Sequence, residues 1–419
     1  MENKNYLCID LKCFFASVEC VKRNLDPFKT NLVVANPTRG NGAICLAISP
    51  SLKKLGVANR CRIFEIPKNI SYIIAMPKMK DYINMSANIY SIYLKYISKN
   101  DILVYSIDEC FLDVTSYLKF YHKTVYELAL DIINDIYMQT GICATAGIGP
   151  NMFLAKVALD ILAKHSKSNI GILDEYLFKE KIWHHTPITD IWNIGKGIAK
   201  RLEKYNVYDL YGITTLNKEI LYKEFGINAT NLISHANGIE TCTIKQCHEY
   251  QAKNHSISNS QILFEDYNFQ EALLVVKEMV EISTLELVSK HLITNKIFLS
   301  IGYSKNIIKP SNGTISLINY TNSYSTISQQ FILLYQKIAN RNVNIRKITI
   351  GFNNVIEDKY ATYNLFSNIE MEEKEKRMQE TILQIKDKYG KNSILKVMNL
   401  LPKATTRKRN TLIGGHNSE

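Results

Sequence analysis

Short apolar runs alternate with helix-like periodicity along the first 165 residues of the chain. Uninterrupted apolar runs predict strands, whereas apolar residues three or four positions apart predict helices. The predicted strands are 6–10, 32–35, 43–48, 102–107, 110–114 and 143–148, and the predicted helices are 14–23, 79–97, 121–140 and 151–163. With residues 11–75 set aside as an insertion, the order is β-α-β-β-α-β, which is the ferredoxin-like arrangement.

This topology predicts that three carboxylates far apart in the sequence meet at one sheet edge. The first and third strands of the arrangement are antiparallel neighbours. Asp10 ends the first strand, and Asp108 and Glu109 form the hairpin turn before the third. Clustered carboxylates repel one another, and hard cations such as Mg²⁺ neutralise them. Two ions ~3.5–4 Å apart would form a clamp for phosphoryl transfer. The competing interpretation is a solvated acidic turn.

The rest of the chain divides into a helical region, a second mixed region and a polar end. In residues 166–240, a helix–hairpin–helix pattern surrounds Gly195-Lys196-Gly197, whose backbone N–H groups and lysine would grip a DNA phosphate. A second β-α-β-β-α-β series follows, with strands near 255–263, 296–303, 314–319 and 345–352 and helices near 269–290 and 325–339. A charge run then opens an exposed helix to Tyr389, and Lys403–Asn410 reads as mostly disordered.

Composition and net charge indicate the kind of partner and the cellular compartment. The 419 residues carry 51 Lys+Arg against 39 Asp+Glu, a formal charge of +12. This excess of positive charge favours a polyanionic partner, of which nucleic acid is the commonest. A basic soluble enzyme is the plainer alternative. No apolar run is long enough for a membrane span. The nine cysteines form no CxxC pair and predict reduced thiols in a cytoplasmic protein.

Two further positions suggest phosphate binding near the carboxylates. The chain turns from strand into helix after Asp10, and a helix N-terminus is a ready phosphate site. Phe14 and Phe15 follow, and because they are adjacent they cannot both point into the same helix face. Lys156, in the helix after Gly149-Pro150, could reach a triphosphate, although a solvent-exposed lysine is the ordinary interpretation.

Three motifs in order give the chain a family resemblance. They are Cys8-Ile9-Asp10 with Phe14–Glu19, then Ser106–Asp113, then Ala146–Asn151 with Leu154-Ala155-Lys156. The set resembles the Y-family translesion DNA polymerases over roughly residues 5–350. Within this family, the chain resembles the bacterial branch of UmuC-like proteins found on Gram-positive chromosomes, plasmids and phages.

The resemblance implies an α+β, multidomain fold of the right-hand polymerase type. A ferredoxin-like palm would comprise 1–10 and 76–165, with small fingers at 11–75. A helical thumb carrying the helix–hairpin–helix would follow at 166–240. The second β-α-β-β-α-β unit would be a DNA-binding little finger at 245–354, and 355–419 would be a C-terminal tail.

The resemblance also implies site residues, carried over by position. Asp10, Asp108, Glu109 and the Leu11 backbone carbonyl would hold two Mg²⁺ ions, with Mn²⁺ as a substitute. Phe14 and Phe15 would contact the nucleotide, and Phe15 is the steric gate that excludes a ribose 2′-OH. Lys53 and Lys156 would contact the triphosphate. Two departures weaken the expected grip: Lys53 replaces an arginine, and Pro50 replaces a tyrosine.

The implied activity is DNA-directed synthesis from deoxynucleoside triphosphates (dNTPs) on a primer 3′-OH. It would have low fidelity, lack proofreading and serve DNA damage tolerance in the SOS response. Partners would be primer–template DNA, dNTPs, activating accessory proteins and the sliding clamp, which Leu365 and Phe366 within 362–366 would bind. Alternatively these two residues pack on the little finger. Two competing functions are a catalytically weak DNA- and clamp-binding protein and another palm-type enzyme, such as a nucleotide cyclase.

Overall fold

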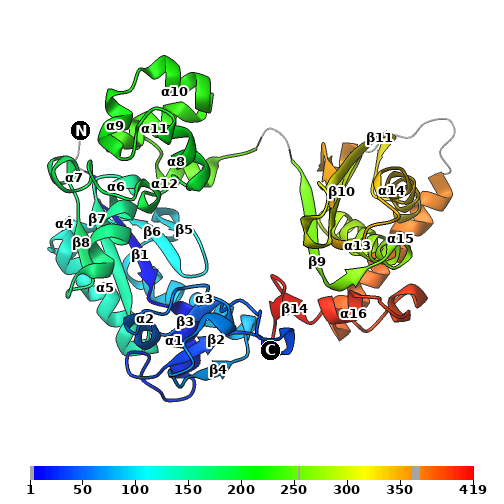
Figure 1. Ribbon diagram of the computed structural model, residues 1–419, viewed down its shortest axis with the longest axis horizontal. Helices are drawn as coiled ribbons and strands as arrows, with labels where there is room; N and C mark the ends of the chain where they lie inside the picture. The colour runs from blue at the N-terminus through cyan, green and yellow to red at the C-terminus, as the bar shows by residue number, and fades with distance from the viewer. Residues whose placement is uncertain (1–3, 253–254, 361–368) are drawn as a thin grey trace. The chain divides into compact units, whose positions relative to one another are not determined.

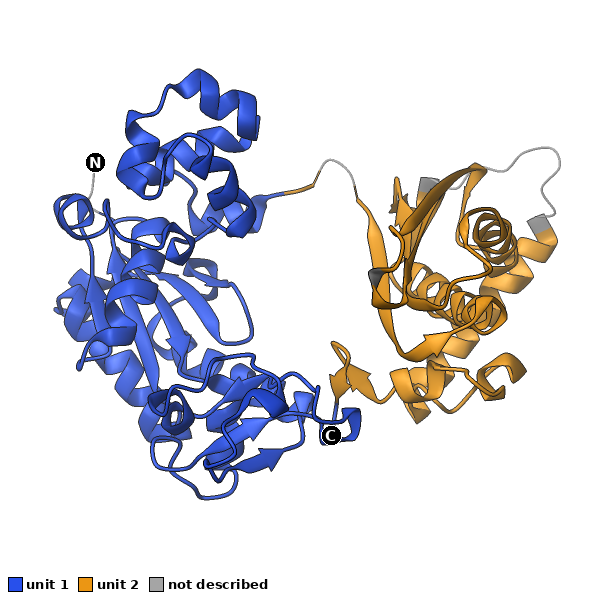
Figure 2. Cartoon of the chain, viewed as in Figure 1, with its two compact units in different colours: residues 1–250, 418–419 blue, residues 251–417 orange. Residues whose placement is uncertain are grey.

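A computed structural model describes residues 4–252, 255–360 and 369–419. The chain folds as two compact units, the first comprising residues 1–250 with 418–419 and the second residues 251–417 (Figure 2). Within the described ranges, no helix combines the length and the hydrophobicity that a bilayer crossing requires.

The first unit is built around a five-stranded sheet with the order β5-β6-β1-β7-β8. The central strand, β1, runs antiparallel to both of its neighbours, β6 and β7, while β8 pairs parallel with β7. The bounds are β1 Tyr6–Leu11, β5 Ile102–Val104, β6 Glu109–Asp113, β7 Ala144–Gly149 and β8 Ile170–Ile172. The predicted ferredoxin-like order is therefore confirmed, with β8 added at one edge.

Helices cover both faces of this sheet. On one face, α3 (Met79–Tyr96) and α5 (Val125–Thr140) share a buried apolar cluster with β1, β6 and β7. The ends of α5 are set locally, because Thr124 forms a capping box with Glu127 and Gly141 closes the helix at φ 69°. On the other face, α6 (Met152–Val157) packs on β1 and β7.

Residues between β1 and α3 form a small subdomain with its own core. After α1 (Phe14–Val21), the strands β2 (Leu32–Val34), β3 (Ala47–Ile48) and β4 (Ile73–Ala75) form a three-stranded sheet. The predicted strand 43–48 is thus shorter than expected. The short helix α2 (Pro50–Lys54) starts at Pro50, and the Ser49 side chain caps it.

The end of the first unit is helical, as predicted. Its helices are α7 Glu175–Lys181, α8 Lys196–Glu203, α9 Leu210–Thr215, α10 Lys218–Phe225, α11 Asn228–Ala236 and α12 Ile244–Glu249. One expectation needs correction, because the segment before Gly195 holds only the 3₁₀ turn η6 (Ile188–Asp190) rather than a full helix.

The second unit contains the second predicted β-α-β-β-α-β series. Its sheet has the order β11-β10-β12-β9, and α13 and α14 lie on one of its faces (Figure 1). The bounds are β9 Ile257–Tyr267, α13 Phe269–Ser289, β10 Leu292–Tyr303, β11 Ser311–Thr321, α14 Tyr324–Ile338 and β12 Ile345–Asn353.

The C-terminal segment folds onto this second unit. The predicted charged helix is α15 (Ile369–Tyr389), and α16 (Thr406–Arg409) follows it. The prediction that Lys403–Asn410 is mostly disordered is wrong. Glu278 of α13, fully buried, accepts hydrogen bonds from the Thr405 backbone N–H at 2.7 Å and the Thr406 backbone N–H at 3.2 Å. This partner lies too far away in the sequence for local composition to reveal it.

Candidate active site

The strand register brings the predicted carboxylates together at the end of β1. Asp10 is the direct partner of Glu109 across the β1–β6 ladder. The next residue, Leu11, donates its backbone N–H to the Asp108 carbonyl at 3.0 Å. The predicted juxtaposition is therefore confirmed at the level of the backbone. The metal-binding roles of these residues and of the Leu11 carbonyl stay predictions.

Each carboxylate of this trio has a defined polar partner. Ser106 donates its hydroxyl to Asp108 Oδ1 at 2.7 Å. Lys156 Nζ lies 2.6 Å from Glu109 Oε1, and Lys164 Nζ lies 3.3 Å from Asp10 Oδ2. Both lysines also contact Asp160, at 3.1 Å and 2.7 Å respectively. Two ammonium groups and Asp160 thus link Glu109 to Asp10.

The donor chemistry at this strand end fits hard divalent cations. Burial raises the pKa of Asp10 to about 6; the Lys164 charge opposes the rise, and the Glu109 and Asp108 carboxylates add to it. A raised carboxylate pKa marks negative charge that a cation would stabilise. All the candidate donors are oxygens, which suit Mg²⁺. Within the described ranges, however, no three His, Cys, Asp or Glu side chains are gathered closely enough to hold an ion. The lysine pairs would have to open for binding.

Lys156 lies in a different environment from the one expected of a helix-surface lysine. Its side chain is buried, with 6% relative exposure, and its amine lies between Glu109 and Asp160. Burial by itself lowers the pKa of Lys156, but the adjacent Cys8, Asp160 and Glu109 raise it above its ordinary value. The structure therefore places Lys156 as a fixed counter-charge beneath Glu109.

Lys164 and Asp160 are site residues that sequence reasoning missed. The π-helical turn η4 (Ala158–Leu162) carries Asp160, and the 3₁₀ turn η5 (Ala163–His165) carries Lys164. The Lys164 side chain is 37% exposed, compared with 6% for that of Lys156. A signal was present in the four-residue spacing of Lys156, Asp160 and Lys164, which places them along one side of a helix.

The two adjacent phenylalanines diverge as expected. Phe14 is buried in the core, whereas Phe15 is half-buried and stacks on Tyr82 of α3, with ring centroids 4.5 Å apart and an interplanar angle of 19°. The Tyr82 hydroxyl donates to the buried Glu19 Oε1 at 2.7 Å. Tyr82 therefore fixes the orientation of the Phe15 ring. The helical spacing of apolar residues in 79–97 does not distinguish this role of Tyr82 from ordinary core packing.

Lys53 is exposed on α2 and lies beside the start of α1. Burial raises the pKa of the Cys13 thiol, and the Lys53 charge and hydrogen bond oppose this rise. Cys13 itself precedes α1 in a left-handed conformation, with φ 48°. Lys53 thus lies near the turn that follows Asp10.

The Gly195-Lys196-Gly197 segment is solvent-exposed at the N-terminus of α8. All three residues are exposed, and no atom lies within 4 Å of a Cβ built on either glycine. The backbone there is open to a phosphate, as the motif predicts. Leu365 and Phe366 lie outside the described residues.

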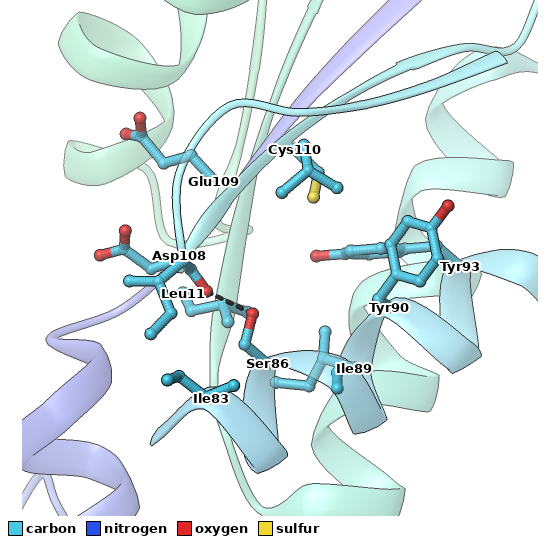
Figure 3. Close-up of a pocket in the computed structure, with 12 residues that line it drawn as sticks. Leu11, Ile83, Ser86, Ile89, Tyr90, Tyr93, Asp108, Glu109 and Cys110 are labelled. Carbon is cyan, nitrogen blue, oxygen red and sulfur yellow. Dashed lines mark hydrogen bonds between the residues drawn. The ribbon is translucent and has the colours of Figure 1, made fainter. Parts of the chain in front are cut away.

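A cavity of about 310 Å³ lies beside the acidic hairpin (Figure 3). Its walls are mainly apolar side chains of α3 and the hairpin, including Ile83 and Tyr90. The Asp108 and Glu109 carboxylates point away from the tyrosines that line it, and Ser86 donates to the Ile107 carbonyl at 2.6 Å. The Ser86 hydrogen bond therefore ties α3 to the residue just before the acidic hairpin turn.

Comparisons with known proteins agree with this architecture. The profile of the impB/mucB/samB family matches residues 9–160, and that of its C-terminal domain matches residues 254–365. UvrX of Bacillus subtilis (strain 168), a protein named for UV-damage repair, is 30% identical over 99% of this chain and 98% of its own length. DNA polymerase IV 2 of the same organism is 26% identical over 99% of both chains.

A solved structure shows the same fold. The Y-family DNA polymerase chimera Dbh-Dpo4(243-245)-Dbh matches with a TM-score of 0.65 and 23% identity, over 84% of this chain and 99% of that chain. The two profile matches include the acidic hairpin and the second sheet. Together with the near full-length relationship to UvrX, these findings show that the chain belongs to the impB/mucB/samB family of UmuC-like, Y-family DNA polymerases.

Proposed function

We propose that this chain is a translesion DNA polymerase that transfers a nucleotide from a dNTP to a primer 3′-OH. The observation that carries the proposal is the register that pairs Asp10 with Glu109 and sets Asp108 beside them. These residues and the Leu11 carbonyl would hold two Mg²⁺ ions, or Mn²⁺ in their place. Bound Mg²⁺ would supply Lewis-acid activation of the hydroxyl and neutralisation of the triphosphate.

Two lysines, Lys156 and Lys164, lie close enough to the carboxylates to affect nucleotide binding. Lys156 is buried, and its amine is paired with Glu109. Lys164 is more exposed and adjoins Asp10. We propose Lys164 as a further triphosphate contact beside Lys156: its ammonium would leave Asp10 for a phosphate oxygen as nucleotide arrives.

Phe15 would exclude ribonucleotides as the steric gate. Stacking on Tyr82 prevents the ring from turning aside when a 2′-OH presses against it. Lys53 would add a point charge near the phosphates, without the bidentate contact of an arginine. Low fidelity, the lack of proofreading, clamp binding through Leu365 and Phe366, accessory proteins and a cytoplasmic location follow from the family resemblance and belong to the same proposal.

The decisive experiment is primer extension with Mg²⁺ and all four dNTPs, on an intact template and on one with an abasic site. Asp108→Asn should abolish extension on both. Asp113→Asn is the matched control, because this carboxylate lies at the far end of the strand that follows Asp108 and accepts from Thr115 Oγ1 at 2.6 Å, away from the trio. Wild-type extension of the intact template alone would contradict the translesion part of the proposal.

The second candidate function is a DNA-binding protein with little catalysis. It is favoured by the lysines that neutralise Asp10 and Glu109 and by the departures at Pro50 and Lys53. Retained DNA binding without extension, even with sliding clamp and accessory proteins added, would select it.

DNA binding itself is tested at Lys196. This lysine is exposed at the start of α8, so we expect it to contact a phosphate. Lys196→Ala should lower the slope of log affinity against log salt by about 0.9. An unchanged slope would remove this segment from the interface.

A further inference from the structure

Two thiols lie in contact at the end of the first unit. The sulfur atoms of Cys242 and Cys247 are 3.4 Å apart. Cys242 is exposed and Cys247 is half-buried, whereas the other seven cysteines of the chain, all within the described ranges, are buried or half-buried. The pair is therefore placed where a small molecule in solution reaches at least one sulfur.

The start of helix α12 holds this pair together. Thr243 is the N-cap, and its capping box with Gln246 consists of two hydrogen bonds, at 2.9 Å and 3.3 Å. Cys242 precedes the cap and Cys247 is the fourth helical residue, which are the two positions of a hydrophobic staple. In the reduced chain the staple is an apolar contact. A disulfide bond of about 2.0 Å would require the sulfurs to approach by little more than 1 Å.

Helix α12 anchors the last residues of the first unit to its sheet. Ile244 is buried against a cluster that includes Tyr6 and Phe111, and His248 Nε2 lies 2.9 Å from the Ile102 carbonyl oxygen. The helix has only six residues, too few to be stable without such contacts. The first unit ends at Tyr250, so the strength of the staple sets how firmly the chain is held before the second unit begins.

We propose that Cys242 and Cys247 form a reversible disulfide by exchange with a low-molecular-weight disulfide, and that this bond locks α12 in its docked state. In the reduced state α12 frays more readily, and each released residue adds up to about 3.3–3.6 Å of connecting chain. This inference goes beyond polymerase activity and does not depend on it.

The chemistry balances without a metal or a cofactor. The exposed Cys242 thiolate attacks one sulfur of the small disulfide and releases one thiol, which leaves a mixed disulfide on Cys242. The Cys247 thiolate then attacks the Cys242 sulfur and releases the second thiol. The protein loses two electrons, the small disulfide gains them, and the two thiol protons end on the released thiols. Burial raises the pKa of Cys242 to about 11, and the Cys247 thiol adds to the rise, so exchange should be slow at neutral pH.

The test uses the full chain equilibrated in glutathione buffers of increasing disulfide fraction. Free thiols are blocked with N-ethylmaleimide, and the chain is digested with trypsin. Cleavage after Lys223, Lys245 and Lys253 places the two cysteines on separate peptides, 224–245 and 246–253. A disulfide-linked pair of these peptides should appear, and the buried Cys45 and Cys61 should stay reduced as an internal control.

Hydrogen exchange of the α12 amides then tests the consequence of the bond. Oxidation should slow their exchange by about tenfold or more in the wild-type chain. It should leave exchange unchanged in Cys242→Ser and Cys247→Ser, neither of which can form the bond. The inference is overturned by glutathione adducts without the linked peptides, by equal oxidation of Cys45 and Cys61, or by linked peptides with unchanged exchange.

Discussion

Replacement of Lys156 by methionine should destabilise the first unit far more than the same change at Lys164. Methionine keeps the length and apolar volume of the lysine stem but removes the charge. The comparison is closely matched, because both lysines contact Asp160 and each contacts one carboxylate of the trio. The two lysines differ chiefly in burial.

The expected magnitude follows from what each change leaves behind. Lys156→Met leaves the Glu109 carboxylate, which is only 16% exposed, without its ion-pair partner. Asp160 keeps its contact with Lys164 at 2.7 Å. Breaking a buried ion pair costs about 3–5 kcal/mol. We expect about 3 kcal/mol, because one of the two carboxylates remains paired. Lys164→Met also leaves a carboxylate unpaired, because Asp10 is only 15% exposed, but water can take the place of the 37% exposed lysine amine, so the cost should be no more than about 1 kcal/mol.

Urea unfolding monitored by tryptophan fluorescence measures this difference. Both tryptophans of the chain, Trp183 and Trp192, lie in the first unit, so the signal reports its unfolding alone. In parallel, Lys164→Met should raise the KM for dNTP. Equal destabilisation by the two variants, or a loss below 1 kcal/mol for Lys156→Met, would refute the assignment of Lys156 as a buried counter-charge.

Three further predictions concern separate parts of the molecule. Protons compete with Mg²⁺ for Asp10, whose pKa is about 6, so the Mg²⁺ concentration for half-maximal extension should rise as pH falls from 7 to 5. Tyr82→Leu removes the ring behind Phe15 and should increase ribonucleotide incorporation up to about tenfold, whereas Tyr82→Phe should not. Glu278→Ala leaves the Thr405 N–H without its buried acceptor, and tryptic cleavage nearby should accelerate about tenfold or more. A Mg²⁺ requirement that does not change with pH would contradict the first prediction. Unchanged ribonucleotide incorporation in Tyr82→Leu would contradict the second, and an unchanged rate of tryptic cleavage in Glu278→Ala the third.

The fold was largely predictable because its signals are local. Apolar runs, caps and turns define both β-α-β-β-α-β series, and their topology then places Asp10 beside Glu109. The start of α2 is equally local, because the Ser49 side chain caps the helix that begins at Pro50. Such features need only neighbouring residues.

The details that sequence reasoning missed depend on distant partners. Lys156 is expected at the surface from its sequence alone, and only the tertiary contact with Glu109 of β6 explains its burial. Lys403–Asn410 reads as a solvated basic segment until Glu278, more than a hundred residues earlier, captures Thr405. Polar residues in such places are stabilised by a tertiary contact that outweighs their local preference.

The π-helical turn at Ala158–Leu162 makes chain length itself a determinant of the site. A π turn holds one residue more than an α turn, and it lies between Lys156 and Lys164. Deletion of one residue there can be absorbed by conversion of the π turn to an α turn, which leaves Lys164 beside Asp10. Deletion of a second residue has no such outlet and would rotate Lys164 by about 100° around the helix axis. Natural variation in length at this turn should therefore be limited to the loss of a single residue.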